Sequence, residues 1–144
     1  MTNKSGLVAI GGAIVGALLV VLYFVVIKPV PLACNSAANC IPVYVINVNG
    51  KKQIQSIPDF ERHGQGAIFW QIQTAGFTFP NDGIKFDKTP LPPEGEFTEC
   101  AVMPGFDGKK YKCNAKGTRG TYGYTVKVTG SVAVSPLDPF VVNN

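Results

Sequence analysis

Few residues of this chain carry side chains that could do chemistry, and none stands in a catalytic pattern. The only histidine, His63, lies in the sequence DFERHGQG near Asp59 and Glu61. A metal site needs a second strong ligand at a suitable spacing, so we interpret His63 as a polar loop residue. A single histidine also excludes a type 1 copper centre, which needs two histidines and a thiolate. We expect no metal, no cofactor and no enzymatic activity.

Two groups of charged residues are the remaining candidates. Glu94, Glu96 and Glu99 follow Pro92-Pro93, and we interpret them as a solvated turn rather than an acid–base site. A basic patch consists of Lys109, Lys110, Lys112, Lys116 and Arg119. We interpret this patch as solvated, and contact with anionic headgroups or with an acidic partner is the alternative. The sequence has no phosphate loop, no serine-hydrolase motif and no zinc-protease motif.

Cysteine usage indicates the compartment. Four cysteines are present, an even number, and an even set in a small domain that follows an apolar segment indicates two disulfides in an oxidising environment. Cys100 and Cys113 bracket the turn Pro104–Gly108 almost symmetrically, which predicts that they pair across a hairpin. Cys34 and Cys40 would then form the second, smaller loop. Other connectivities remain open at this point.

An apolar block precedes these cysteines. Residues Gly6–Ile27 are 22 positions without a charge or a proline, enough to cross a bilayer as a helix. The block is too long for a signal peptide, and Pro31 stands where a lipobox needs an aliphatic residue. We therefore predict an uncleaved signal-anchor. The predicted segments are a cytoplasmic tail (1–5), a transmembrane helix (6–27), a linker with a small disulfide loop (28–41) and a periplasmic domain (42–144).

One face of the predicted helix carries small side chains. Ala9, Gly12, Ala13 and Gly16 recur at helical spacing, and Gly12 and Gly16 form a GxxxG motif. Small residues let a neighbouring helix approach closely, so we predict packing against another helix. Self-dimerisation and docking into a larger assembly both satisfy this pattern. The helix has no ionisable residue, so we expect it to hold the protein in place rather than to carry protons or ions.

Strand patterns dominate the rest of the chain. In IPVYVINV, Tyr44, Ile46 and Val48 share one face, and Asn49-Gly50 predicts a tight hairpin turn. Ile68, Trp70 and Ile72 alternate likewise, and we interpret Trp70 as a core residue rather than a ligand platform. In YGYTVKV we expect Tyr122, Tyr124, Val126 and Val128 to point inward, and Thr125 and Lys127 to point outward. Eight or nine short strands between glycine and proline turns predict an antiparallel β-sandwich, Ig-like or cupredoxin-like. The C-terminal SPLDPFVVNN is interpreted as a final edge strand, with a partner-binding tail as the alternative.

Net charge excludes one class of partner. The chain carries +4, and residues 29–144 carry 11 basic and 9 acidic side chains. That balance is unlike a nucleic-acid-binding surface.

Several runs of residues resemble a known group of proteins. IFWQIQTAGFTFPNDGIKF, the cysteine hairpin, GTYGYTVKV and LDPFVVN are similar to elements of small exported bacterial β-sandwich domains of unassigned function, over residues 67–144. The resemblance implies a fold and a compartment but no catalytic residue. By architecture alone, one helix and one sandwich also resemble accessory subunits of large bacterial membrane assemblies, such as a photosynthetic reaction centre with its light-harvesting rings.

Two functions remain in view. The first is a non-catalytic inner-membrane subunit, with its N-terminus cytoplasmic, that docks by its helix into a larger complex and stabilises it on the periplasmic side. Its expected partners are other membrane subunits and membrane lipid, with a homodimer as a further option. The second is a membrane-tethered module that binds a small ligand, peptide or glycan.

Overall fold

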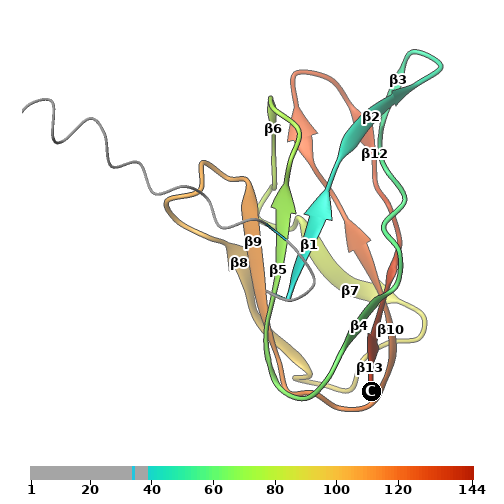
Figure 1. Cartoon of the computed structure of the whole chain (residues 1–144), viewed down its shortest axis with the longest axis vertical. Helices are drawn as coiled ribbons and strands as arrows, with labels where there is room; N and C mark the ends of the chain where they lie inside the picture. Colours follow the sequence, from blue (N-terminus) through green and yellow to red (C-terminus); the bar gives the residue numbers. More distant parts are fainter. Residues whose placement is uncertain (1–33, 35–38) are drawn as a thin grey trace, which may run out of the picture. The chain divides into compact units, whose positions relative to one another are not determined.

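Strands make up all the regular structure of the residues that the computed structural model describes, which are Cys34 and 39–144 (Figure 1). No helix in this part of the chain is long and apolar enough to cross a membrane. The predicted transmembrane helix lies outside the described residues. So does its small-residue face, which consists of Ala9, Gly12, Ala13 and Gly16.

Two four-stranded sheets form the body of the domain. The first, here the disulfide sheet, has the strand order β1 (Cys40–Val43), β5 (Gly66–Ile72), β9 (Lys110–Ala115) and β8 (Phe97–Val102). The second, here the C-terminal sheet, has the order β4 (Phe60–Arg62), β13 (Phe140–Asn143), β10 (Gly120–Val126) and β7 (Ile84–Lys88). Buried residues of both sheets belong to one apolar cluster, so the sheets pack face to face.

Two smaller sheets extend this body. A three-stranded sheet has the order β12 (Val134–Ser135), β3 (Lys51–Ile54) and β2 (Val45–Val48), and a two-stranded sheet joins β11 (Thr129–Gly130) to β6 (Phe77–Thr78). Short interruptions divide long strands: β1 and β2 are separated by Tyr44 alone. The expected all-antiparallel pairing is wrong in part, because β1–β5, β3–β12 and β4–β13 are parallel pairs.

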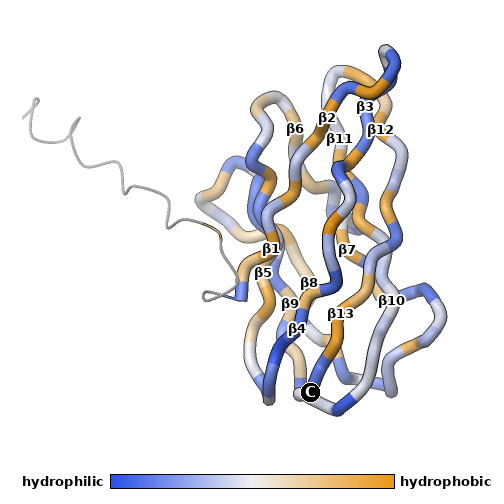
Figure 2. The backbone as a smooth tube through the Cα atoms, turned by 45° about the vertical axis from the view of Figure 1, so that its right-hand side comes forward, coloured by the Kyte–Doolittle hydropathy of each residue, from blue (hydrophilic) through white to orange (hydrophobic). Residues whose placement is uncertain are grey.

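Hydrophobic and hydrophilic residues alternate along several strands (Figure 2), and this alternation decides which residues are buried in the core. On β5, Ile68, Trp70 and Ile72 are buried, as predicted. Tyr122, Tyr124, Val126 and Val128 are buried along and just after β10, also as predicted. On β1 and β2 the inward residues are Ile41, Val43 and Val45, so Tyr44 and Val48 lie on the exposed face.

The hairpin predicted at Asn49-Gly50 joins β2 to β3. Asn49 has φ 51° and Gly50 has φ 81°, and positive values at both central positions are typical of a type I′ turn. Val48 pairs with Lys51 directly across this turn. The turn therefore sets the register that buries Val45 opposite Ile54.

The C-terminal strand is not an edge strand, contrary to expectation. β13 lies between β4 and β10, parallel to the first and antiparallel to the second. Val141 is fully buried there. The sequence pattern shows only the strand's apolar character, because strand order depends on pairing with residues some 80 positions earlier.

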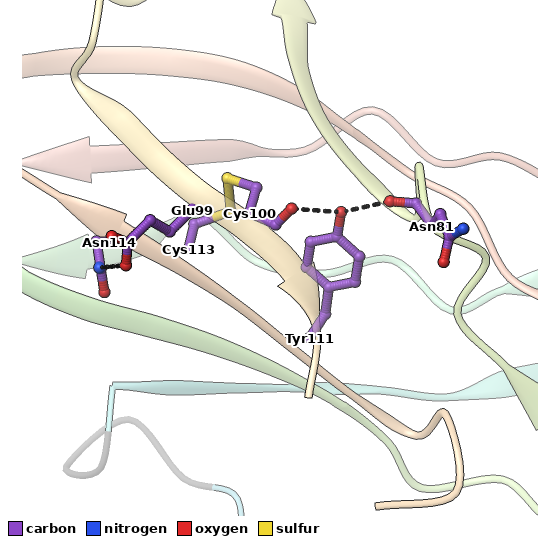
Figure 3. The surroundings of a disulfide bond; sticks show 6 residues. All are labelled: Asn81, Glu99, Cys100, Tyr111, Cys113 and Asn114. Carbon is purple, nitrogen blue, oxygen red and sulfur yellow. Dashed lines mark hydrogen bonds between the residues drawn. A yellow bond between two sulfur atoms is a disulfide. The ribbon is translucent and has the colours of Figure 1, made fainter. Parts of the chain in front are cut away.

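Both predicted disulfides form. Cys34 bonds to Cys40 with a Cα–Cα distance of 5.0 Å, and Cys100 bonds to Cys113 with 4.1 Å. Figure 3 shows the second bond between neighbouring strands β8 and β9, close to Tyr111, whose hydroxyl donates to the carbonyl of Asn81 at 2.8 Å. Two disulfides indicate an oxidising, extracytoplasmic environment.

Removing the hairpin disulfide should lower stability appreciably. For the double variant Cys100→Ala/Cys113→Ala we expect a loss of roughly 3 kcal/mol in unfolding free energy, because the open chain regains the entropy that a loop of this size had lost. Urea unfolding, followed by the fluorescence of the single tryptophan, measures this loss. An unchanged midpoint would show that strand pairing alone holds the hairpin.

Candidate functional site

Trp70 belongs to the core and is not available to a ligand. Its side chain is 0% exposed, and its indole N–H donates to the Tyr124 hydroxyl at 3.2 Å. The ring meets Tyr124 and Phe86 edge-on, with centroids 5.6 and 6.3 Å away. Burial also raises the pKa of the Tyr124 hydroxyl well above its usual value. The buried pair is thus a neutral, hydrogen-bonded part of the packing.

Acrylamide should quench the fluorescence of this tryptophan only weakly. Trp70 is the single tryptophan of the chain, so the signal reports one site. We expect the quenching constant of the folded protein to be several-fold smaller than that of the protein in urea. Efficient quenching under native conditions would contradict the packing described above.

Glu96 is buried, contrary to the expectation of a solvated turn. Its carboxylate is 1% exposed and accepts hydrogen bonds from the amides of Gly117 at 2.9 Å and Thr118 at 3.2 Å. Glu94 and Glu99 are exposed, as expected. Glu96 therefore fixes the loop between β9 and β10 and has no free oxygen edge toward solvent.

Three further polar residues surround this loop and complete a buried group, here the polar end cluster: Arg62, Glu96, Tyr122 and Asn143. Asn143 donates to the carbonyl of Thr118 at 2.6 Å, and the Tyr122 hydroxyl lies 3.0 Å from the same carbonyl. Burial lowers the pKa of Arg62, and the negative charge of Glu96 opposes that shift. The cluster joins β4, β10 and β13 to the loop.

Metal binding has no support in the described part of the chain. His63, Asp59 and Glu61 are all exposed. Among Cys34 and residues 39–144, no group of three or more histidine, cysteine, aspartate or glutamate side chains could hold an ion.

The outer face of the C-terminal sheet carries paired charges. Asp82 contacts Lys127 at 2.7 Å and Lys85 at 3.6 Å, and Asp138 contacts Lys88 at 3.2 Å. The hydrogen bond from Lys127 lowers the pKa of Asp82. Thr125 was expected to point outward, and its hydroxyl lies 2.7 Å from Asp87 and 3.0 Å from Asp138. These contacts leave it only 5% exposed.

The outer face of the disulfide sheet carries the predicted basic patch. Trp70, Tyr111 and Cys113 point into the core, so the alternate residues Phe69, Lys110 and Lys112 point outward. Four of the five basic residues lie on β9 or its flanks, and we call these the basic strip: Lys109, Lys110, Lys112 and Lys116. Arg119 is exposed in the loop leading to β10. None of the ion pairs in the described residues involves the strip.

A groove of about 640 Å³ lies along β1, Tyr44 and the segment 55–61. Cys34 and Cys40 line it, together with the exposed ring of Tyr44. Pro42 and Pro58 lie on its two walls. Because proline has no amide hydrogen, both walls are poor templates for pairing with a further strand.

Comparison with known proteins adds no family. No protein-family model matches this chain, and no curated protein matches it. The resemblance of residues 67–144 to exported sandwich domains therefore stays a prediction.

The sequence alone did not reveal the polar end cluster or the groove. Arg62 and Glu96 are separated by more than 30 positions, and charged residues after a proline pair are usually solvated. The sequence contains one hint of this burial, since Glu96 directly precedes the aromatic Phe97, which begins a strand. A glutamate before an aromatic strand residue is too common to identify a buried carboxylate.

Proposed function

We propose that this protein is a non-catalytic, single-pass membrane subunit. In this proposal residues 6–27 form a helix in the bacterial inner membrane and the sandwich, Ig-like or cupredoxin-like in topology, lies in the periplasm. The helix docks into a larger complex through Ala9, Gly12, Ala13 and Gly16, and the domain stabilises that complex from outside.

The Cys34–Cys40 disulfide is the observation that carries the proposal. It fastens the first strand of the domain to a residue only seven positions after Ile27, the last residue of the apolar block. Seven residues span at most about 25 Å when fully extended. A domain on such a short tether would remain close to the bilayer and to any neighbouring subunit, so weak contacts would suffice for association.

The described residues support a structural role in a second way. Of their two buried charged side chains, Glu96 accepts hydrogen bonds from the loop 117–119, and its negative charge opposes the lowering of the pKa of Arg62 by burial. The tryptophan, Trp70, is fully buried in the core. We therefore infer that the domain acts through its surface.

Native-gel migration tests the proposal directly. The full chain is extracted from its own membranes in mild detergent, and mass spectrometry identifies what migrates with it. Stoichiometric companions would support a subunit role and name the complex, photosynthetic or other. Migration as a single chain or a dimer would contradict it.

Substituting the small-residue face should release the protein from its complex. In Gly12→Ile/Gly16→Ile, two branched side chains would prevent close approach of a partner helix. We expect the variant to lose its companions on the native gel while its urea unfolding midpoint stays at the wild-type value. Retained companions would contradict docking through this face.

The groove favours a second candidate, a membrane-tethered binding module. An exposed aromatic ring beside the polar side chains of Gln55, Ser56 and Asp59 is a combination that suits a glycan. Titration of the full chain with soluble peptidoglycan fragments tests this candidate. Binding that Tyr44→Ala abolishes would favour it over the subunit role.

A further inference from the structure

We infer that the outer face of the disulfide sheet binds the anionic surface of a lipid bilayer. This inference rests on the proposed membrane anchor, because the anchor keeps the bilayer within reach. It goes further by naming the face of the domain, the residues and the partner.

Strand register places an aromatic residue and a cation in one row across this face. Cys40 pairs with Phe69, and Phe69 pairs with Lys112. Neighbouring strands lie about 4.8 Å apart, so Lys112 is roughly 10 Å from Cys40. Ile41 belongs to the core cluster and Cys40 does not, so the alternation turns Cys40 to the same side of the sheet as Phe69 and Lys112, where its side chain is 4% exposed.

The tether is therefore attached to the face that carries the basic strip. Cys34, through its bond to Cys40, fastens the preceding chain to β1, an edge strand of the sheet that carries the basic strip. A short chain of about 25 Å at most connects that point to Ile27. The residue to which the preceding chain is bonded, Cys40, belongs to β1 of the disulfide sheet.

The distribution of charge also favours the disulfide sheet as the face that contacts the bilayer. The three ion pairs of the described residues all involve β7, β10 or their flanks, so the cations of the C-terminal sheet are already neutralised. The basic strip has no such pairs. Among the acidic residues near the strip, Glu99 accepts a hydrogen bond from Asn114, and Glu94 and Asp107 form no ion pair with it. The strip thus keeps a net positive charge that anionic headgroups complement.

Aromatic rings hold one of these cations in place. The amino group of Lys110 lies 4.8 Å from the ring centroid of Phe69 and 4.7 Å from that of Phe106. Both contacts are cation–π interactions, which restrain the lysine on the outer surface. Aromatic and basic side chains side by side are the combination that favours the headgroup region over a purely aqueous surface.

Lysine reactivity in nanodiscs tests the inference on the full chain. The protein is reconstituted in phosphatidylcholine discs, and in discs with about 30% phosphatidylglycerol to supply the anionic charge. A neutral acylating reagent is added, and mass spectrometry gives the rate at each lysine. We expect Lys112 and Lys116 to react at least about threefold more slowly in the anionic discs, and added salt to remove the difference by screening.

Controls are available within the same molecule. Lys85 and Lys127 lie on the opposite face and should show the same rate in both kinds of disc. In Lys112→Glu/Lys116→Glu the protection of Lys110 should be lost. The matched charge change Lys51→Glu/Lys52→Glu, on β3, should leave that protection intact.

Three outcomes would overturn the inference, and they differ. If the chain stays in the discs but the lysines of both faces react equally slowly, or none reacts more slowly, the assignment of the disulfide sheet as the bilayer-binding face is wrong and the anchor is unaffected. Protection in native membranes but not in anionic discs would identify an acidic protein as the partner instead of lipid. Failure of the chain to enter the discs would overturn the anchor, and this inference with it.

Discussion

Glu96→Ala should unfold at a markedly lower urea concentration than the wild type, with a loss of about 3–4 kcal/mol in unfolding free energy. The substitution removes the acceptor of the Gly117 and Thr118 amides. It also leaves Arg62, 4% exposed, without the negative charge that offsets its burial. Trp70 fluorescence reports the transition.

Two other glutamates of the same segment are the natural controls. Glu94 and Glu99 are exposed, so their alanine variants should differ from the wild type by about 0.5 kcal/mol or less. Glu96→Gln keeps an oxygen for the two amides but removes the charge, and we expect an intermediate loss. A Glu96→Ala variant as stable as Glu94→Ala would show that the buried carboxylate contributes nothing.

Gly117→Ala should be comparably damaging, for a steric reason. Gly117 has φ +92°, and a Cβ atom there would lie 2.4 Å from the backbone carbon of Gly64 and 2.6 Å from the amide nitrogen of Gln65. Neither backbone atom can rotate away. We expect a loss of about 3–5 kcal/mol, which combines the left-handed backbone penalty with the overpacking of two loops.

Gly105→Ala is the matched control for this substitution. Gly105 has φ +80°, but nothing lies within 4 Å of the position of its Cβ. Its alanine variant should show the backbone penalty alone, about 1–2 kcal/mol. Equal losses in the two variants, measured by urea unfolding, would contradict the close packing of the loops 63–65 and 117–119.

Local features of this fold could be predicted from the sequence. The Asn49-Gly50 turn, the inward alternation of Ile68, Trp70 and Ile72, and both disulfides depend on neighbours in the chain or on simple spacing. The alternation follows from the two-residue period of a strand, and the turn follows from the ability of asparagine and glycine to adopt positive φ. Such signals can be recognised without knowledge of the rest of the fold.

Features that depend on distant partners could not be predicted. The central position of β13 depends on residues 60–62, and the burial of Glu96 depends on Arg62 and on the loop after β9. Thr125 faces outward, as its place in the alternation predicts, but Asp87 and Asp138 cover it. In each case, local pattern gives the direction of a side chain, and tertiary contacts decide its exposure.

The order of folding during export follows from the place of β13 in its sheet. In the C-terminal sheet, β4 pairs only with β13. Residues 60–62 therefore have no strand to pair with in that sheet until residues 140–143 have been synthesised. The emerging chain can close the β2–β3 and β8–β9 hairpins early, since their contacts are local. The C-terminal sheet can be completed only after β13 is available for pairing. Until then the exposed edge of β10 needs protection from aggregation, so a chain stalled near residue 139 should be a substrate for chaperones or proteases rather than a folded domain.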